Sequence, residues 1–137
     1  MIQGQVIWFE IPVINFERAI NFYSEVLDIS IERKRFLDRE HGVFNLDKSV
    51  IRGVLLEKEN HQPGAGIVLF FFVLDLSESL KKAVELGGKI EINKTLLKQK
   101  TETGNLTINS NMIGGDIGYY AEIMDCEGNR ICLYSNS

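Results

Sequence analysis

The sequence predicts an α+β fold made of two βαβββ modules. Residues 6–28 and residues 66–88 each contain an apolar stretch, a capping residue and an amphipathic stretch with helical spacing. The capping residues, Asn15 and Asp75, lie 60 positions apart, which is close to half of the 137 residues. Stretches with strand character follow each predicted helix. We therefore expect one domain, residues 1–137, with modules at about 1–58 and 66–137.

The first module begins with a strand over residues 5–13, which are rich in β-branched and aromatic residues. Asn15 is a favourable N-cap, and the apolar stripe after it predicts a helix that ends at Asp28. Residues 29–36, 43–46 and 50–57 are the three further strands. The turn-rich residues 59–66 are the best candidate for a linker between the halves.

The second module begins with a strand over residues 67–74. Its run Phe70-Phe71-Phe72 is continuous rather than alternating, which predicts that both faces of the strand are covered. Asp75, with Glu78 three residues later, resembles a capping box, and Gly87-Gly88 ends the helix. We expect strands at 89–97, 118–124 and 130–134, an additional short strand at 106–108, and a turn at 126–129.

Composition and charge exclude several classes of function. The net charge is −4, whereas nucleic acids and anionic membranes both require a basic surface. The longest apolar run, residues 67–74, is too short to span a membrane, and no signal peptide is visible. We therefore expect a cytoplasmic protein with no nucleic-acid or membrane partner. Its two cysteines, Cys126 and Cys132, are expected to be reduced thiols.

Three motifs, in order along almost the whole chain, resemble the vicinal oxygen chelate superfamily of glyoxalase I, bleomycin-resistance proteins and extradiol dioxygenases. Residues 9–13 followed by 17–23 resemble the opening strand and the Arg-Ala-x-x-Phe-Tyr helix of that family. The second helix ends in Gly87-Gly88-Lys89-Ile90. Residues 125–131 resemble the Asp-Pro-Glu-Gly-Asn turn before the last strand, with Cys126 in the place of the proline.

The resemblance implies that the two modules form a curled mixed sheet around a cleft, and that the protein is a homodimer. It also implies four metal ligands in the members that do metal chemistry. The corresponding positions here are Trp8, residues 52–55, Leu69 and Cys132, and a single thiol cannot hold a metal alone. We therefore expect no metal at the usual site. A divalent metal at other positions remains the alternative.

Glu10 is the strongest candidate for a catalytic residue, because an acid inside an apolar strand is costly to bury without a partner. In a cleft it would act as a general base with a raised pKa, or as a single metal ligand. The alternative is that Glu10 pairs with an arginine or faces solvent. Trp8 lies two positions away and is expected on the same strand face.

The remaining candidates would bind a ligand. Trp8, Phe71 and Tyr120 would stack on a planar molecule, although each could instead fill the core. Glu122 would share a face with Tyr120, and the alternative for it is a solvated acid on the outer face. Cys132 is either a reactive thiol or a buried inert one. His41 and His61 are expected to be exposed loop residues.

These residues favour a metal-free protein of the bleomycin-resistance kind, which holds a planar or amphipathic small molecule. The alternative from another class is a lyase, isomerase or dioxygenase in which Glu10 and Glu122 are rearranged ligands. A third possibility is a non-catalytic interaction module, because fold does not fix function.

Overall fold

The computed structural model describes residues 3, 6–36, 38–49, 51–60, 62, 67–96, 98–100, 106–108 and 118–137. His61 lies outside these residues. The first half contains β1 (Trp8–Val13), α1 (Phe16–Leu27), β2 (Ile31–Phe36), β3 (Arg39–Phe44) and β4 (Arg52–Glu57). The second half contains β5 (Leu69–Phe72), α2 (Leu76–Glu85), β6 (Lys89–Leu96), β7 (Lys98–Lys100), β8 (Leu106–Ile108), β9 (Tyr119–Met124) and β10 (Arg130–Ser135).

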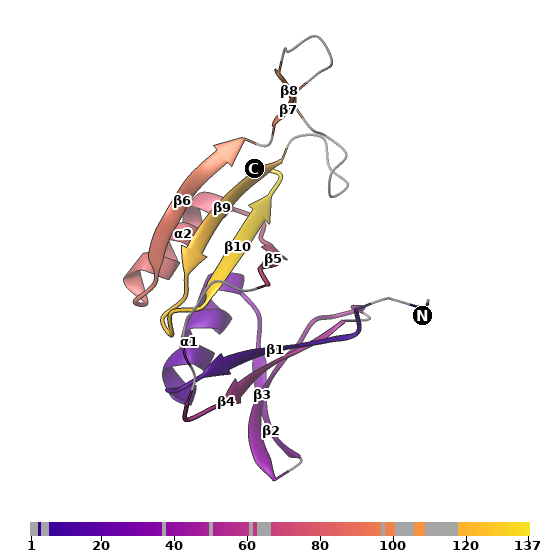
Figure 1. Cartoon of the computed structure of the whole chain (residues 1–137), viewed down its shortest axis with the longest axis vertical. Helices are drawn as coiled ribbons and strands as arrows, with labels where there is room; N and C mark the ends of the chain where they lie inside the picture. The colour runs from indigo at the N-terminus through magenta and orange to yellow at the C-terminus, as the bar shows by residue number, and fades with distance from the viewer. Residues whose placement is uncertain are drawn as a thin grey trace.

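The strands confirm the predicted βαβββ modules (Figure 1). They form two mixed four-stranded sheets with the orders β1-β4-β3-β2 and β5-β10-β9-β6. In both sheets the module's first strand is an edge strand that runs parallel to the last strand, whereas the other pairings are antiparallel. β7 and β8 form a separate small hairpin inserted into the second module. The two halves therefore share one topology.

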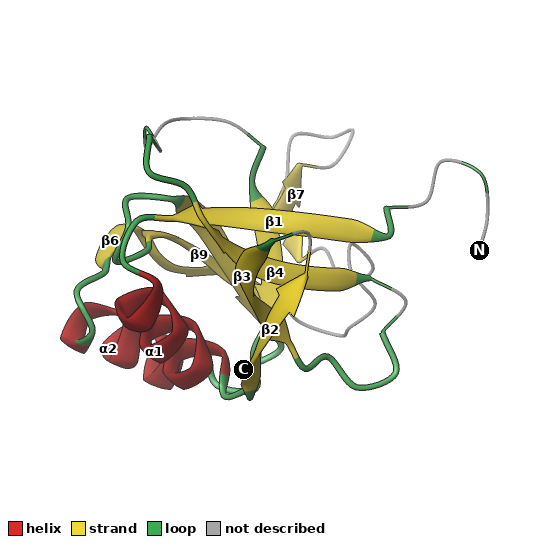
Figure 2. Ribbon diagram, turned by 90° about the horizontal axis from the view of Figure 1, so that it is seen from below, coloured by secondary structure: helices red, strands yellow, loops and turns green. Residues whose placement is uncertain are grey.

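The two helices begin at the predicted caps. The side chain of Asn15 accepts a hydrogen bond from the Arg18 N–H, and that of Asp75 accepts one from the Glu78 N–H, so each satisfies a free donor of the first turn. Both helices turn their apolar stripes inward and lie side by side on one side of the strands (Figure 2). Among the described residues, no helix is long and apolar enough to cross a membrane.

A hydrophobic core joins the two modules. The Phe9 ring of β1 contacts the Phe71 ring of β5, with 5.8 Å between their centroids. Gly53 on β4 makes room for Phe9, because a Cβ atom at this position would collide with the phenyl ring. Both helices contribute side chains to this core, so the core-facing side of each sheet faces the helices, and we call the opposite side the outer face.

Three expectations from the sequence were wrong in detail. β3 begins at Arg39 rather than Val43, because residues 31–36 and 39–44 pair along their whole length as a hairpin. The phenylalanine run is not covered on both faces, because the side chains alternate and leave Phe70 54% and Phe72 57% exposed. His41 is buried, since it lies inside β3 rather than in a loop.

Candidate functional site

Trp8 and Glu10 share the outer face of β1, as the sequence predicted. The indole Nε1–H of Trp8 donates a hydrogen bond to Oε2 of Glu10 over 3.3 Å. Both residues are exposed, with Trp8 42% accessible. Glu10 is therefore not an acid buried without a partner.

Glu122, Tyr120 and Cys132 share the outer face of the second sheet. Cys132 lies opposite Glu122 on the neighbouring strand, and a carboxylate oxygen of Glu122 lies 3.0 Å from Nε of Arg130. The carboxylate is mostly buried, with 19% of the side chain exposed, so Arg130 balances its charge. Glu122 is thus an ion-paired residue within the face rather than a solvated acid.

Cys132 is buried beside this ion pair. Burial raises the pKa of the thiol, and the carboxylate of Glu122 raises it further, while Arg130 acts in the opposite direction. A raised pKa keeps the sulfur protonated at neutral pH, which makes it a poor nucleophile and a poor metal ligand. The environment supports the inert alternative for this residue.

The two candidate acids lie on different sheets and have different partners. Glu10 lies on the first sheet and interacts with Trp8, whereas Glu122 lies on the second sheet and interacts with Arg130. Among the residues that the structure describes, no group of three or more His, Cys, Asp and Glu side chains is placed to hold a metal. The arrangement of these side chains offers no chelating set that includes both acids.

Phe71 lies apart from the other candidates, because it points from β5 toward the core. Its ring contacts Phe9, Tyr23 and Phe44, with centroid separations of 5.8, 6.3 and 6.1 Å. Leu69 faces the same way and also packs against the core. Phe71 therefore packs on the core side of its strand, whereas Trp8 lies on the outer face of β1.

An apolar pocket lies where β5 meets the first module, and we call it the β5 pocket. Its volume is about 330 Å³, which is within the range typical of small-molecule sites. Among the described residues of its wall, Ser49 carries the one polar side chain. The lining residues are Val6, Phe9, Leu27, Ile29, Leu46, Ser49, Ile51, Leu69, Phe70, Phe71 and Phe72. Sequence reasoning found Phe71 but missed the rest, because the walls come from four separate segments of the chain.

The turn of residues 125–129, which we call the clamp turn, closes another contact between the modules. The carboxylate of Asp125 accepts hydrogen bonds from the Tyr23 hydroxyl at 2.5 Å and from the N–H groups of Glu127 and Asn129 at 2.8 and 2.7 Å. Asn129 also donates from its side chain to the Pro12 carbonyl at 2.9 Å. This motif therefore fixes the β9–β10 turn to β1 and α1.

Glu127 completes the clamp turn. Its buried carboxylate accepts a hydrogen bond from the Asn15 N–H at 2.6 Å and pairs with Arg18 at 3.0 Å. A carboxylate at the first turn of α1 is also favoured by the helix dipole. The part of the resemblance that lies in this turn thus makes structural contacts between the two modules.

Comparison with known proteins places the fold. No protein-family model and no curated protein matches the chain. Solved structures do match over almost the whole chain. The fold is that of the glyoxalase and bleomycin-resistance proteins. The predicted vicinal oxygen chelate resemblance is thereby confirmed at the level of fold.

Three of these structures illustrate the range of the fold. A glyoxalase/bleomycin resistance protein from Albidiferax ferrireducens is 17% identical, with 93% of this chain and 96% of that chain covered and a TM-score of 0.58. An antibiotic-binding protein from a Streptomyces species is 19% identical, with 100% and 99% covered and a TM-score of 0.61. A variant of the fosfomycin resistance protein from Listeria monocytogenes, solved with Mn(II), is 8% identical, with 99% and 95% covered and a TM-score of 0.63.

Proposed function

We propose that this protein binds an apolar or planar small molecule in the β5 pocket and requires no metal to do so. The observation that carries the proposal is the pocket itself, whose described lining side chains are apolar except for that of Ser49. Burial of a hydrocarbon surface there would contribute roughly 25 cal/mol per Å². One of the structures that shares the fold is described as an antibiotic-binding protein, which supports a role in binding.

The outer faces would extend this site. Phe70 and Phe72 line the pocket and also project beside Cys132 and Tyr134 of β10. Tyr120 continues the same row across the sheet, opposite Tyr134. We infer that an amphipathic ligand places its apolar part in the pocket and its polar part toward the Glu122–Arg130 pair, with Trp8 and Glu10 as a second polar contact from β1.

A neutral fluorescent probe, N-phenyl-1-naphthylamine, tests the pocket. We expect saturable enhancement of its fluorescence, which Ser49→Phe reduces roughly tenfold in affinity because the added ring fills the cavity. Ser77→Phe, on the exposed side of α2, is the matched control and should leave the affinity unchanged. Equal affinities of the two variants, or tight stoichiometric uptake of a divalent metal that binding requires, would contradict the proposal.

We also propose that two copies associate through the free edge of β5. Among the strands that the structure describes, β5 pairs with β10 alone, and this edge strand carries the exposed Phe70 and Phe72, with the exposed Ile67 just before it. Such an edge is a template for association unless it is covered. Light scattering should show a dimer that Phe72→Lys weakens, and a wild-type monomer at micromolar concentration would exclude this assembly.

A further inference from the structure

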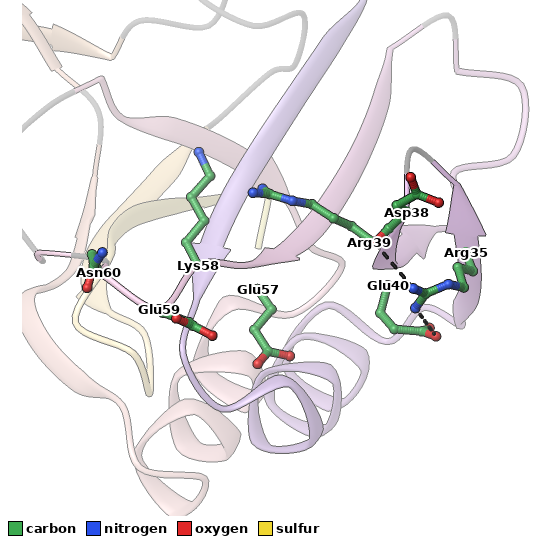
Figure 3. Close-up of a pocket in the computed structure, with 8 residues that line it drawn as sticks. All are labelled: Arg35, Asp38, Arg39, Glu40, Glu57, Lys58, Glu59 and Asn60. Atoms are coloured by element: carbon green, nitrogen blue, oxygen red, sulfur yellow. Dashed lines mark hydrogen bonds and ion pairs between the residues drawn. The ribbon is translucent and has the colours of Figure 1, made fainter.

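A second pocket lies at the far end of β4, where β3 and β4 part, and we call it the notch (Figure 3). Its volume is about 640 Å³. The lining side chains are polar or charged, and they come from the tip of the β2–β3 hairpin, from the last residue of β4 and from the segment that follows it. Residues Ile51 of the β5 pocket and Glu57 of the notch are separated by one strand length, about 20 Å, so the two pockets are distinct.

The strands part at two successive like-charge pairs. The antiparallel register of β3 and β4 ends at His41 opposite Leu56. Continued by one and two residues, this register sets Glu40 opposite Glu57 and Arg39 opposite Lys58. Like charges directly opposite each other destabilise a ladder, which gives a physical reason for the opening of the sheet at this point.

The two pairs face opposite sides of the sheet, because neighbouring residues of a strand alternate. Arg39 of β3 and Lys58, directly after β4, extend toward one rim of the notch, whereas the carboxylates of Glu57 and Glu59 lie on the other (Figure 3). Glu40 is balanced by Arg35 at 3.5 Å. Within the described part of the chain, no ion pair neutralises Arg39, Lys58, Glu57 or Glu59.

The buried His41 helps to hold the cationic rim. Its Nδ1 lies 3.0 Å from the carbonyl oxygen of Arg39, a distance that suits a hydrogen bond donated by the ring. This contact fixes the backbone of Arg39, and with it the starting point of the side chain that carries the guanidinium group. A fixed starting point lowers the conformational entropy that binding would cost.

We propose that the notch binds a small zwitterion, with the anionic group between Arg39 and Lys58 and the ammonium group beside Glu57 and Glu59. A guanidinium and an ammonium together suit a carboxylate or phosphate oxygen, and two carboxylates suit a primary ammonium. A ligand that carries both charges neutralises the cationic rim with its anionic group and the anionic rim with its ammonium group. A simple anion would relieve one rim and would lie close to the acids of the other, which repel it.

A length series of ω-amino acids, from glycine to 6-aminohexanoate, tests this proposal through chemical-shift titration of the intact protein. One length should bind best, roughly tenfold more tightly than butanoate or butylammonium, which carry a single charge each. Arg39→Gln and Lys58→Gln should each weaken that binding several-fold, as should Glu57→Gln. Lys81→Gln and Glu85→Gln, exposed on α2, are the matched controls and should have no effect.

Three results would overturn the proposal. These are the absence of saturable shifts at about 100 mM ligand, butanoate that binds as tightly as the best zwitterion, and binding that survives both Arg39→Gln and Lys58→Gln. The notch variants should leave N-phenyl-1-naphthylamine binding intact, because the β5 pocket lies at the other end of β4. Failure of the notch and failure of the β5 pocket are therefore separate outcomes.

Discussion

The β3–β4 turn and the β9–β10 turn occupy equivalent places in the two modules, but they meet the rest of the protein differently. The clamp turn, between β9 and β10, is fastened to α1 and β1 by hydrogen bonds of a buried aspartate and an ion-paired glutamate. The β3–β4 turn instead contributes Leu46 and Ser49 to the wall of the β5 pocket. Equivalent turns of the two modules thus make different contacts. The clamp turn makes polar contacts with the first module and we call this the closed contact, whereas the β3–β4 turn borders the apolar β5 pocket and we call this the open contact.

The largest expected effect is at Asp125, the centre of the closed contact. Asp125→Ala removes the acceptor for Tyr23, Glu127 and Asn129, and these donors stay buried or half-buried. We expect a loss of about 3–5 kcal/mol in the free energy of unfolding, measured by urea denaturation.

Asp47→Ala provides the matched control, because Asp47 is an exposed aspartate in the equivalent turn of the first module. Its effect should stay within about 0.5 kcal/mol. Similar losses for the two variants would show that the two turns do not differ as we describe.

At the open contact, protein stability should depend strongly on the side chain of Phe71 and weakly on that of Phe72. Phe71→Ala removes ring contacts with Phe9, Tyr23 and Phe44 and should cost about 2–3 kcal/mol, somewhat less than a fully buried ring. Phe72→Ala removes a ring that is 57% exposed and should cost less than about 1 kcal/mol. The reverse order in thermal unfolding would mean that β5 has the opposite face inward.

Much of the scaffold was predictable because it depends on local patterns. Asn15 and Asp75 are polar residues directly before amphipathic stripes, and both cap helices as expected. The face shared by Trp8 and Glu10 follows from strand alternation alone. These features need no knowledge of which segments meet in space.

The pockets were not predictable, because they depend on which segments meet. The β5 pocket combines the start of β1, the end of α1 and the β3–β4 turn with β5. Continuous apolar runs are ambiguous for the same reason: the sequence of residues 70–72 does not reveal that only one ring enters the core. His41 was misjudged because a glycine neighbour suggested a loop, whereas Gly42 is buried within β3.

Tyr23 makes the stability contributed by the closed contact depend on pH. Burial, and then the Asp125 carboxylate, raise the pKa of Tyr23 well above its ordinary value of 10.0. The unfolded chain releases this proton near pH 10 while the folded protein retains it, so the stabilisation is complete below pH 10 and is lost as the pH rises further.

Tyr23→Phe should therefore cost about 1–2 kcal/mol near pH 7. The difference from wild type should shrink by up to about 1.4 kcal/mol per pH unit above pH 10. Urea denaturation at a series of pH values measures both quantities. A difference that stays constant from pH 8 to pH 11 would contradict the raised pKa of this hydroxyl.

The smallest effect is expected at Cys126, which lies in the clamp turn beside Asp125. Partial burial, and then the charge of Asp125, raise the pKa of this thiol to about 11, so roughly one molecule in a thousand is a thiolate at pH 8. Cys126→Ser should change the free energy of unfolding by less than about 0.5 kcal/mol.

The reactivity of the same thiol gives a second measurement. In a Cys132→Ser background, alkylation of Cys126 by iodoacetamide should be slow. An Asp125→Ala substitution in that background should accelerate alkylation, because it removes a negative charge and loosens the turn. If the rate at pH 8 already matched that of an unfolded thiol, the clamp turn would open on the timescale of the reaction and the contrast between the two contacts would disappear.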